Sequence, residues 1–104
     1  MEKVITRRLF LAFMQVHILH HAKIEPVFGL AMMEELQRHG YNVSPGTLYP
    51  LLHTLEEHGL LDKKERVVEG KVRKYYSLTA KGERVLAEAK RKTSELFHEI
   101  VEEG

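Results

Sequence analysis

The chain has 104 residues, of which 43% are hydrophobic and 30% charged, and its formal net charge is only +1. This length predicts one small domain, and no apolar run approaches the roughly 20 residues that a membrane-spanning helix needs. The sequence has no cysteine, which excludes disulfides, thiol catalysis and cysteine-bound zinc, and the N-terminus lacks a signal-peptide pattern, so we expect a cytoplasmic protein.

The first predicted helix runs from Val4 to about His21 and carries a broad apolar face. This apolar surface is larger than one small core requires, so we expect part of it to be buried against a second copy of the chain. Leu9 and Phe13 are the residues of this helix that we place at such a dimer contact.

Three histidines, His17, His20 and His21, lie close together near the end of this helix. His17 and His21 are four residues apart and share one helix face, where two imidazoles could bind a metal ion or respond to pH. The alternative is that they are polar side chains at the subunit border, and the sequence offers no obvious further ligand. We therefore predict no metal site, and name His17 and His21 as the residues that would form one.

A connector, Lys23–Pro26, separates this helix from a second one predicted from Phe28 to His39, because the residue before a proline avoids helical backbone angles. Gly40 ends the second helix, and residues 41–43 form the turn into the next one. The candidate core residues of the second helix are Phe28, Leu30, Met33 and Leu36.

The third predicted helix begins at Ser44, its candidate N-cap, and ends at His58. Leucines at intervals of three and four form one buried stripe. They are Leu48, Leu51, Leu52 and Leu55. We place Thr47, Tyr49 and His53 on the opposite face, where they can donate hydrogen bonds or stack. A short helix of this kind fits the major groove of DNA, so these three residues and Ser44 are candidate DNA contacts.

Two β-prone runs, 63–68 and 71–78, flank the turn Glu69-Gly70 and predict a β-hairpin. Between Lys63 and Lys74 six residues are basic and two acidic, although the whole chain sums to only +1. A basic hairpin beside a helix suited to the major groove is typical of a winged helix-turn-helix. The candidate contacts from the hairpin to DNA are Lys71, Arg73 and Lys74.

Thr79 is placed to cap the last predicted helix, which runs from Ala80 to about Val101. Apolar and small residues recur there at intervals of three and four, which predicts a heptad seam. A long polar helix has little to pack on within one small domain, so we expect it to pair with a second copy of the chain. The residues that we place in this contact are Leu86, Ala89, Leu96, Phe97 and Ile100.

The chain resembles the PadR family of winged-helix transcriptional regulators in three linked segments. These are Ser-Pro-Gly-Thr-Leu-Tyr-Pro-Leu-Leu at 44–52, Leu-Glu-x-x-Gly-Leu-Leu at 55–61 and Gly-Lys-Val-Arg-Lys-Tyr-Tyr-Ser-Leu-Thr-x-x-Gly at 70–82. The resemblance runs without a gap from about Phe28 to Leu86. It implies a dimeric repressor whose helix from Ser44 enters DNA and whose hairpin tip touches the backbone or the minor groove. Effectors in the family are diverse, so an unidentified small-molecule effector is also implied.

These features predict a mainly α fold with a small β-hairpin, a winged helix-turn-helix with N- and C-terminal dimerisation helices. Residues 1–79 would form the DNA-binding part, including the N-terminal helix, and residues 80–104 the dimerisation helix of the same compact domain. The expected function is sequence-specific transcriptional regulation by a homodimer, with helix 44–58 in the major groove and hairpin 63–78 on the backbone or minor groove. Repression is the mode that the resemblance implies.

Two other functions stay open. A winged helix can bind a protein instead of DNA, which the low net charge allows. The same DNA binding could also be gated by a metal ion or ligand through His17 and His21. We expect neither an enzyme nor a cofactor, because the sequence has no phosphate-binding glycine loop, no nucleophile elbow and no paired-histidine metalloprotease motif.

Overall fold

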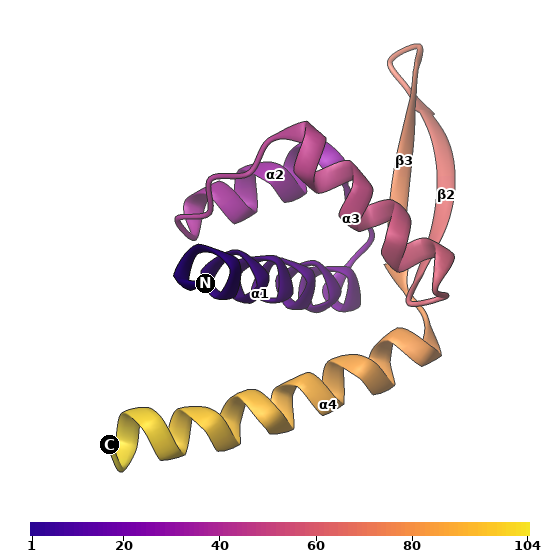
Figure 1. Ribbon diagram of the computed structural model, residues 1–104. Coiled ribbons are helices and arrows are strands. Elements are labelled where there is room, and N and C mark those ends of the chain that lie inside the picture. The colour runs from indigo at the N-terminus through magenta and orange to yellow at the C-terminus, as the bar shows by residue number, and fades with distance from the viewer.

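Four α-helices and a three-stranded antiparallel sheet make up the fold of the computed structural model, which describes all 104 residues. The elements in chain order are α1 (Glu2–Ile24), β1 (Val27–Phe28), α2 (Gly29–Arg38), α3 (Pro45–Glu57), β2 (Leu61–Val68), β3 (Lys71–Leu78), α4 (Ala80–Phe97) and the π-helix η1 (His98–Glu102). Helix α1 lies between the α2–α3 pair and α4, and the β2–β3 hairpin stands beside α3 (Figure 1). None of the helices combines the length and the apolar character needed to cross a membrane.

The N-terminal half differs from the prediction at two boundaries. Helix α1 continues past His21 to Ile24 and ends at Glu25, whose extended backbone (φ −161°) is the conformation that a following proline favours. Phe28, predicted to open the second helix, instead belongs to β1 and pairs with Tyr75 of β3. This strand of two residues is too short to leave a periodic pattern in the sequence.

The core lies where α1, α2, α3 and the base of the sheet meet. Its thirteen buried apolar residues include four from α1 and the stripe Leu48, Leu52 and Leu55 of α3. In α2 the prediction holds for Leu36, and Met33 is half-buried against the core, but Leu30 is 53% exposed and Met32 takes the inward position. At about 100° per residue, Gly29, Met32 and Leu36 share one face of α2, whereas Leu30 lies about 120° around the helix from Leu36 and is turned outward.

The β2–β3 hairpin, called the wing below, forms as predicted. Eight residues pair on each strand, and Glu69 and Gly70 both have positive φ, 51° and 77°, as a two-residue type I′ turn requires. Side chains alternate across the sheet, so Lys74 shares a face with Tyr76 and Arg73 lies on the other face. Tyr76 is buried, and this burial raises the pKa of its hydroxyl.

Helix α4 begins at the predicted cap and then leaves the core. The Thr79 hydroxyl oxygen accepts a hydrogen bond from the Gly82 N–H at 3.0 Å and donates one to the Gly59 carbonyl at 2.6 Å. Leu86 is only 2% exposed within the single chain, so its assignment to the dimer contact is wrong. The first turns of α4 pack on α1, which places Leu86 in the chain's own core.

Candidate nucleic-acid interface

Helix α3 presents a polar front that faces away from its leucine stripe. Because successive helix residues are turned by about 100°, the positions opposite the stripe follow one line of the helix surface. These exposed residues are Gly46, Pro50, His53, Thr54 and Glu57. Gly46 has no side chain and Pro50 has a compact one, so this face of α3 can approach the floor of a DNA groove closely. Thr54 is a candidate base contact that sequence reasoning missed, although its angle on the helix was enough to find it.

Two N-terminal candidates of α3 lie differently from the prediction. Thr47 is half-buried and lines a pocket against α1, because two residues of helix turn it about 200° away from Tyr49. It therefore does not share one face with Tyr49 and His53. Ser44 occupies the N-cap position, but its side chain makes no capping hydrogen bond, and its carbonyl oxygen accepts from the Thr47 N–H at 3.0 Å. The exposed Ser44 hydroxyl is thus available to an outside acceptor.

A groove of about 480 Å³ separates α3 from the wing. Tyr49 and His53 line it from α3, and Lys63 and Lys74 line it from the wing. These four residues supply a phenol, an imidazole and two ammonium groups, and Arg73 and Tyr76 of β3 also line the groove. Of these, the phenol and the ammonium groups are donors that bind phosphate oxygens, and such contacts carry no sequence information themselves.

His53 is paired within α3. Its Nε2 lies 2.8 Å from Oε1 of Glu57, one turn further along the helix, and both side chains are exposed. The carboxylate repels phosphates, whereas at the floor of the major groove it can accept a hydrogen bond from a cytosine amino group. This part of α3 is therefore better suited to base edges than to the DNA backbone.

The outer face of the wing, which points away from α3, concentrates basic residues. The strand register places four of them on it. They are Lys64, Arg66, Lys71 and Arg73. Arg66 and Arg73 are direct cross-strand partners, an arrangement of like charges that is unfavourable without compensation. The Arg66 guanidinium lies 4.9 Å from the centre of the Tyr75 ring, and that of Arg73 lies 4.8 Å from the centre of the Phe28 ring.

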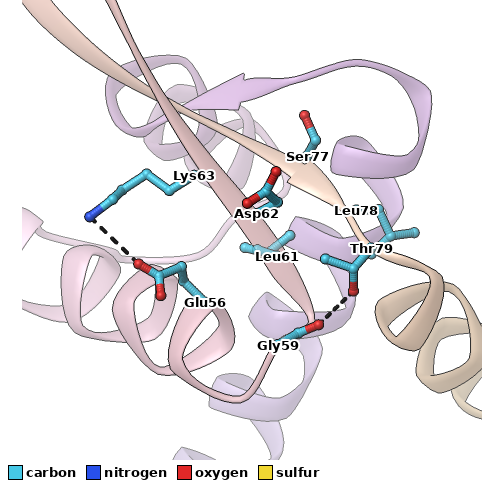
Figure 2. A pocket seen from close by; sticks show the side chains of 8 residues that line it. All are labelled: Glu56, Gly59, Leu61, Asp62, Lys63, Ser77, Leu78 and Thr79. Atoms are coloured by element: carbon cyan, nitrogen blue, oxygen red, sulfur yellow. Dashed lines mark hydrogen bonds and ion pairs between the residues drawn. The ribbon is translucent and has the colours of Figure 1, made fainter.

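A second hollow, of about 600 Å³, lies at the base of the wing (Figure 2). Two contacts lie within it: Lys63 Nζ lies 3.5 Å from Glu56 Oε1, and Thr79 donates to the Gly59 carbonyl. These contacts join α3, the wing and the start of α4. We assign the hollow a structural role, because these contacts connect three elements of the fold.

Apolar side chains are exposed along α1 and the distal half of α4. Five of the residues predicted for a dimer contact are among them: Leu9, Phe13, Leu96, Phe97 and Ile100. Ala89 is half-buried. A cleft of about 420 Å³ between the two helices is lined by Phe13 and Val16 from α1 and by Thr93 from α4. The far ends of α1 and α4 diverge (Figure 1), and the large apolar side chains on them are exposed in the single chain.

Comparison with known proteins places this geometry among transcriptional regulators. The family model described as the transcriptional regulator PadR-like family matches residues 18–88. The chain is 49% identical over 90 residues to the transcriptional regulator Rv3488 of Mycobacterium tuberculosis, covering 86% of this chain and 84% of that protein. The family is one of regulators and not a class of enzymes.

Solved structures share the whole fold. A PadR family transcriptional regulator from Eggerthella lenta matches with a TM-score of 0.80 and 32% identity, over 94% of this chain and 87% of that one. A PadR-like transcriptional regulator from Bacillus cereus matches with a TM-score of 0.81 and 28% identity, over 89% and 92%. These matches confirm the predicted winged helix-turn-helix and the resemblance found in segments 44–52, 55–61 and 70–82.

Proposed function

Because the chain belongs to the PadR-like family of transcriptional regulators, we propose that it binds operator DNA as a homodimer and represses transcription. The observation that carries this proposal is the groove between α3 and the wing, where Tyr49 and His53 face Lys63 and Lys74. A polar helix front and a basic hairpin thus border one surface. This is the combination that reads a major groove while binding the adjacent phosphates.

The two parts of this surface have different tasks in the proposal. The front of α3, with Thr54 and the His53–Glu57 pair, enters the major groove and contacts base edges. Lys71 and Lys74 bind phosphates from opposite faces of the wing, so the backbone of one DNA strand can lie along the edge of the hairpin. If a dimer neutralises about six phosphates, the logarithm of the association constant falls with the logarithm of salt concentration at a slope of roughly −5.

The exposed apolar surface of α1 and α4 supports the homodimer. Leu9 and Phe13 on α1 and Leu96, Phe97 and Ile100 on α4 would bury their side chains against the same residues of a second copy. A two-fold arrangement repeats α3 and the wing on both sides of the axis. The two half-sites then lie about 10 base pairs apart, or a multiple of this spacing.

One observation favours a second candidate, the binding of a protein by the wing. Val67 and Val72 are direct cross-strand partners near the hairpin tip, and both are strongly exposed. An apolar pair at this position can pack on a protein, although it also fits the wall of a DNA minor groove. The low net charge of the chain does not favour either partner.

Selection of binding sequences from a random duplex pool separates these candidates. An enriched motif with two-fold symmetry supports a dimeric, sequence-specific regulator and gives the operator directly. The matched control is a variant with Lys71, Arg73 and Lys74 changed to glutamate, which should enrich nothing. Absence of any motif with the unaltered protein, at low salt, would overturn the DNA-binding proposal and shift the weight to a protein partner.

A further inference from the structure

Three histidines from two helices meet where α1 lies against the C-terminal end of α2. His17 and His21 extend from α1, and His39 is the C-cap of α2. One ring nitrogen from each lies within 4.8 Å of the others. The rings of His17 and His39 stack with their centres 4.6 Å apart. The fold therefore supplies the third imidazole that spacing within the first helix could not reveal.

A carboxylate completes the cluster. Oε1 of Glu35 lies 3.5 Å from Nε2 of His21 and 3.2 Å from Nε2 of His39. Ligand atoms of a tetrahedral zinc shell, with bonds of about 2.0–2.1 Å, stand about 3.3 Å from one another. The two distances from Glu35 thus already match the spacing of such a shell, and the histidine nitrogens lie within 4.8 Å of one another. Arg38 forms an ion pair with the other oxygen of Glu35 and fixes the orientation of the carboxylate.

The protonation of the cluster also suits a cation. Partial burial, followed by the neighbouring His39, lowers the pKa of His17, and partial burial lowers the pKa of His21. The hydrogen bond from Arg38 lowers the pKa of Glu35. Neutral imidazoles and an ionised carboxylate are the forms that bind metal ions, so the direction of these shifts favours metal binding.

We propose that His17, His21 and His39, with Glu35 as the fourth ligand or as their orienting carboxylate, bind one divalent transition-metal ion per chain. Imidazole nitrogens select zinc, cobalt or nickel over magnesium and calcium, which take oxygen ligands. Without cysteine in the chain, the site has no thiolate to favour copper(I). Metal binding here does not depend on whether the protein binds DNA.

The position of the site gives the ion a mechanical role. His39 is followed by the turn that leads through Val43 into α3, and the Tyr41 ring packs on His17 with ring centres 5.5 Å apart. An ion bound to both helices fixes the end of α2 and this turn to α1. It would thereby restrict the motion of the recognition helix relative to the proposed dimer surface, a consequence that rests on the proposed function.

Direct titration of the full chain tests the site. The protein is purified without a histidine tag, treated with EDTA and exchanged into metal-free buffer, because seven histidines and a tag would otherwise confuse the stoichiometry. Cobalt(II) is added and its visible absorption followed, and zinc is then added in competition. We expect one equivalent per chain and the intense bands of tetrahedral cobalt, which zinc removes. Glu35→Gln should weaken the affinity about 10- to 100-fold.

Surface histidines provide matched controls. His53 and His98 each lie 2.8 Å from a glutamate oxygen four residues later, but neither has a second histidine nearby. His53→Ala and His98→Ala should therefore bind cobalt as the unaltered chain does. His39→Ala, which removes a side chain that is 46% exposed, should lose the tetrahedral bands. Absence of these bands with the unaltered chain, or their persistence in His39→Ala, would overturn the proposal.

Discussion

The ring of Tyr49 lies directly against the backbone of Gly29, so that a Cβ added to Gly29 would stand 2.6 Å from the Tyr49 hydroxyl oxygen. No real Cβ tolerates such a contact. Gly29 is the first residue of α2 and is buried, whereas Tyr49 is half exposed on α3. The absence of a side chain at Gly29 is therefore what allows the tyrosine to lie in the groove beside the wing.

Gly29→Ala should weaken DNA binding with little loss of stability. The tyrosine side chain is the flexible partner and is 49% exposed, so it would rotate out of the groove. Loss of one hydrogen bond to a charged group corresponds to about 1.5–3 kcal/mol, or roughly tenfold or more in affinity. Fluorescence anisotropy with the selected operator measures this change, and Tyr49→Phe isolates the hydroxyl. Equal affinity of Tyr49→Phe and the unaltered chain would mean that the hydroxyl makes no phosphate contact.

Lys71 should contribute one unit to the salt dependence of DNA binding. Its side chain is on the outer face of the wing, where Lys64, Arg66 and Arg73 raise the local positive charge. Lys71→Gln is expected to lower affinity about equally for all DNA sequences and to reduce the salt slope by about 1.

The matched control for this measurement is Lys92→Gln. Lys92 is an exposed lysine on α4, 3.9 Å from Glu95 and outside the proposed DNA surface. The same charge change there should leave the slope unaltered. Equal effects of the two substitutions would indicate a response to net charge only, and would contradict a phosphate contact at Lys71.

Gly82→Ala should destabilise the junction between the wing and α4. A Cβ at Gly82 would lie 2.2 Å from the Leu60 carbonyl oxygen, a backbone atom that cannot rotate away. We expect a loss of about 1–3 kcal/mol in the free energy of unfolding. Urea denaturation measures it. Gly46→Ala is the control, because its nearest neighbour would be Ser44 Oγ at 3.8 Å, and it should not lower the stability.

The parts of this fold that follow from local chemistry were predictable from the sequence. The cap at Thr79, the hairpin turn at Glu69-Gly70 and the leucine stripe of α3 each depend on neighbouring residues and formed as expected. The strand at Val27–Phe28 was not predictable, because only its pairing with β3 makes it a strand. Leu86 has the spacing of a heptad seam, which predicted a contact with a second copy, but α4 packs on α1 and buries Leu86 in the chain's own core.

The candidate site was predictable only in part. The basic wing and the exposed Tyr49 follow from composition and spacing. Thr47 was assigned to the wrong face because the prediction overlooked the rotation of about 200° between Thr47 and Tyr49 on the helix. The third histidine, His39, is 18 residues from His21 in the sequence, and the α1–α2 connection brings them together. Contacts between elements were thus the information that the sequence pattern lacked.

Zinc should tighten operator binding in the unaltered chain. An ion that ties α1 to the end of α2 reduces the motion that DNA binding would otherwise have to restrict. We expect a gain of about fivefold or more between EDTA-treated and zinc-loaded protein, measured by anisotropy at fixed salt. His39→Ala should bind DNA with the affinity of the metal-free chain in both conditions. A zinc effect that survives in His39→Ala would place the responsible ion elsewhere.

Leu96→Glu should convert the proposed dimer to a monomer. Leu96 is 52% exposed in the single chain, on the distal part of α4 that extends away from the core. If it is buried against a second copy, a carboxylate at this position carries a desolvation cost without a partner. Light scattering gives the mass directly. Leu30→Glu is the control, since Leu30 is 53% exposed but lies on α2, outside this surface. A Leu96→Glu chain that keeps the mass of a dimer would show that distal α4 is not the interface, whereas a monomer from both variants would indicate general destabilisation.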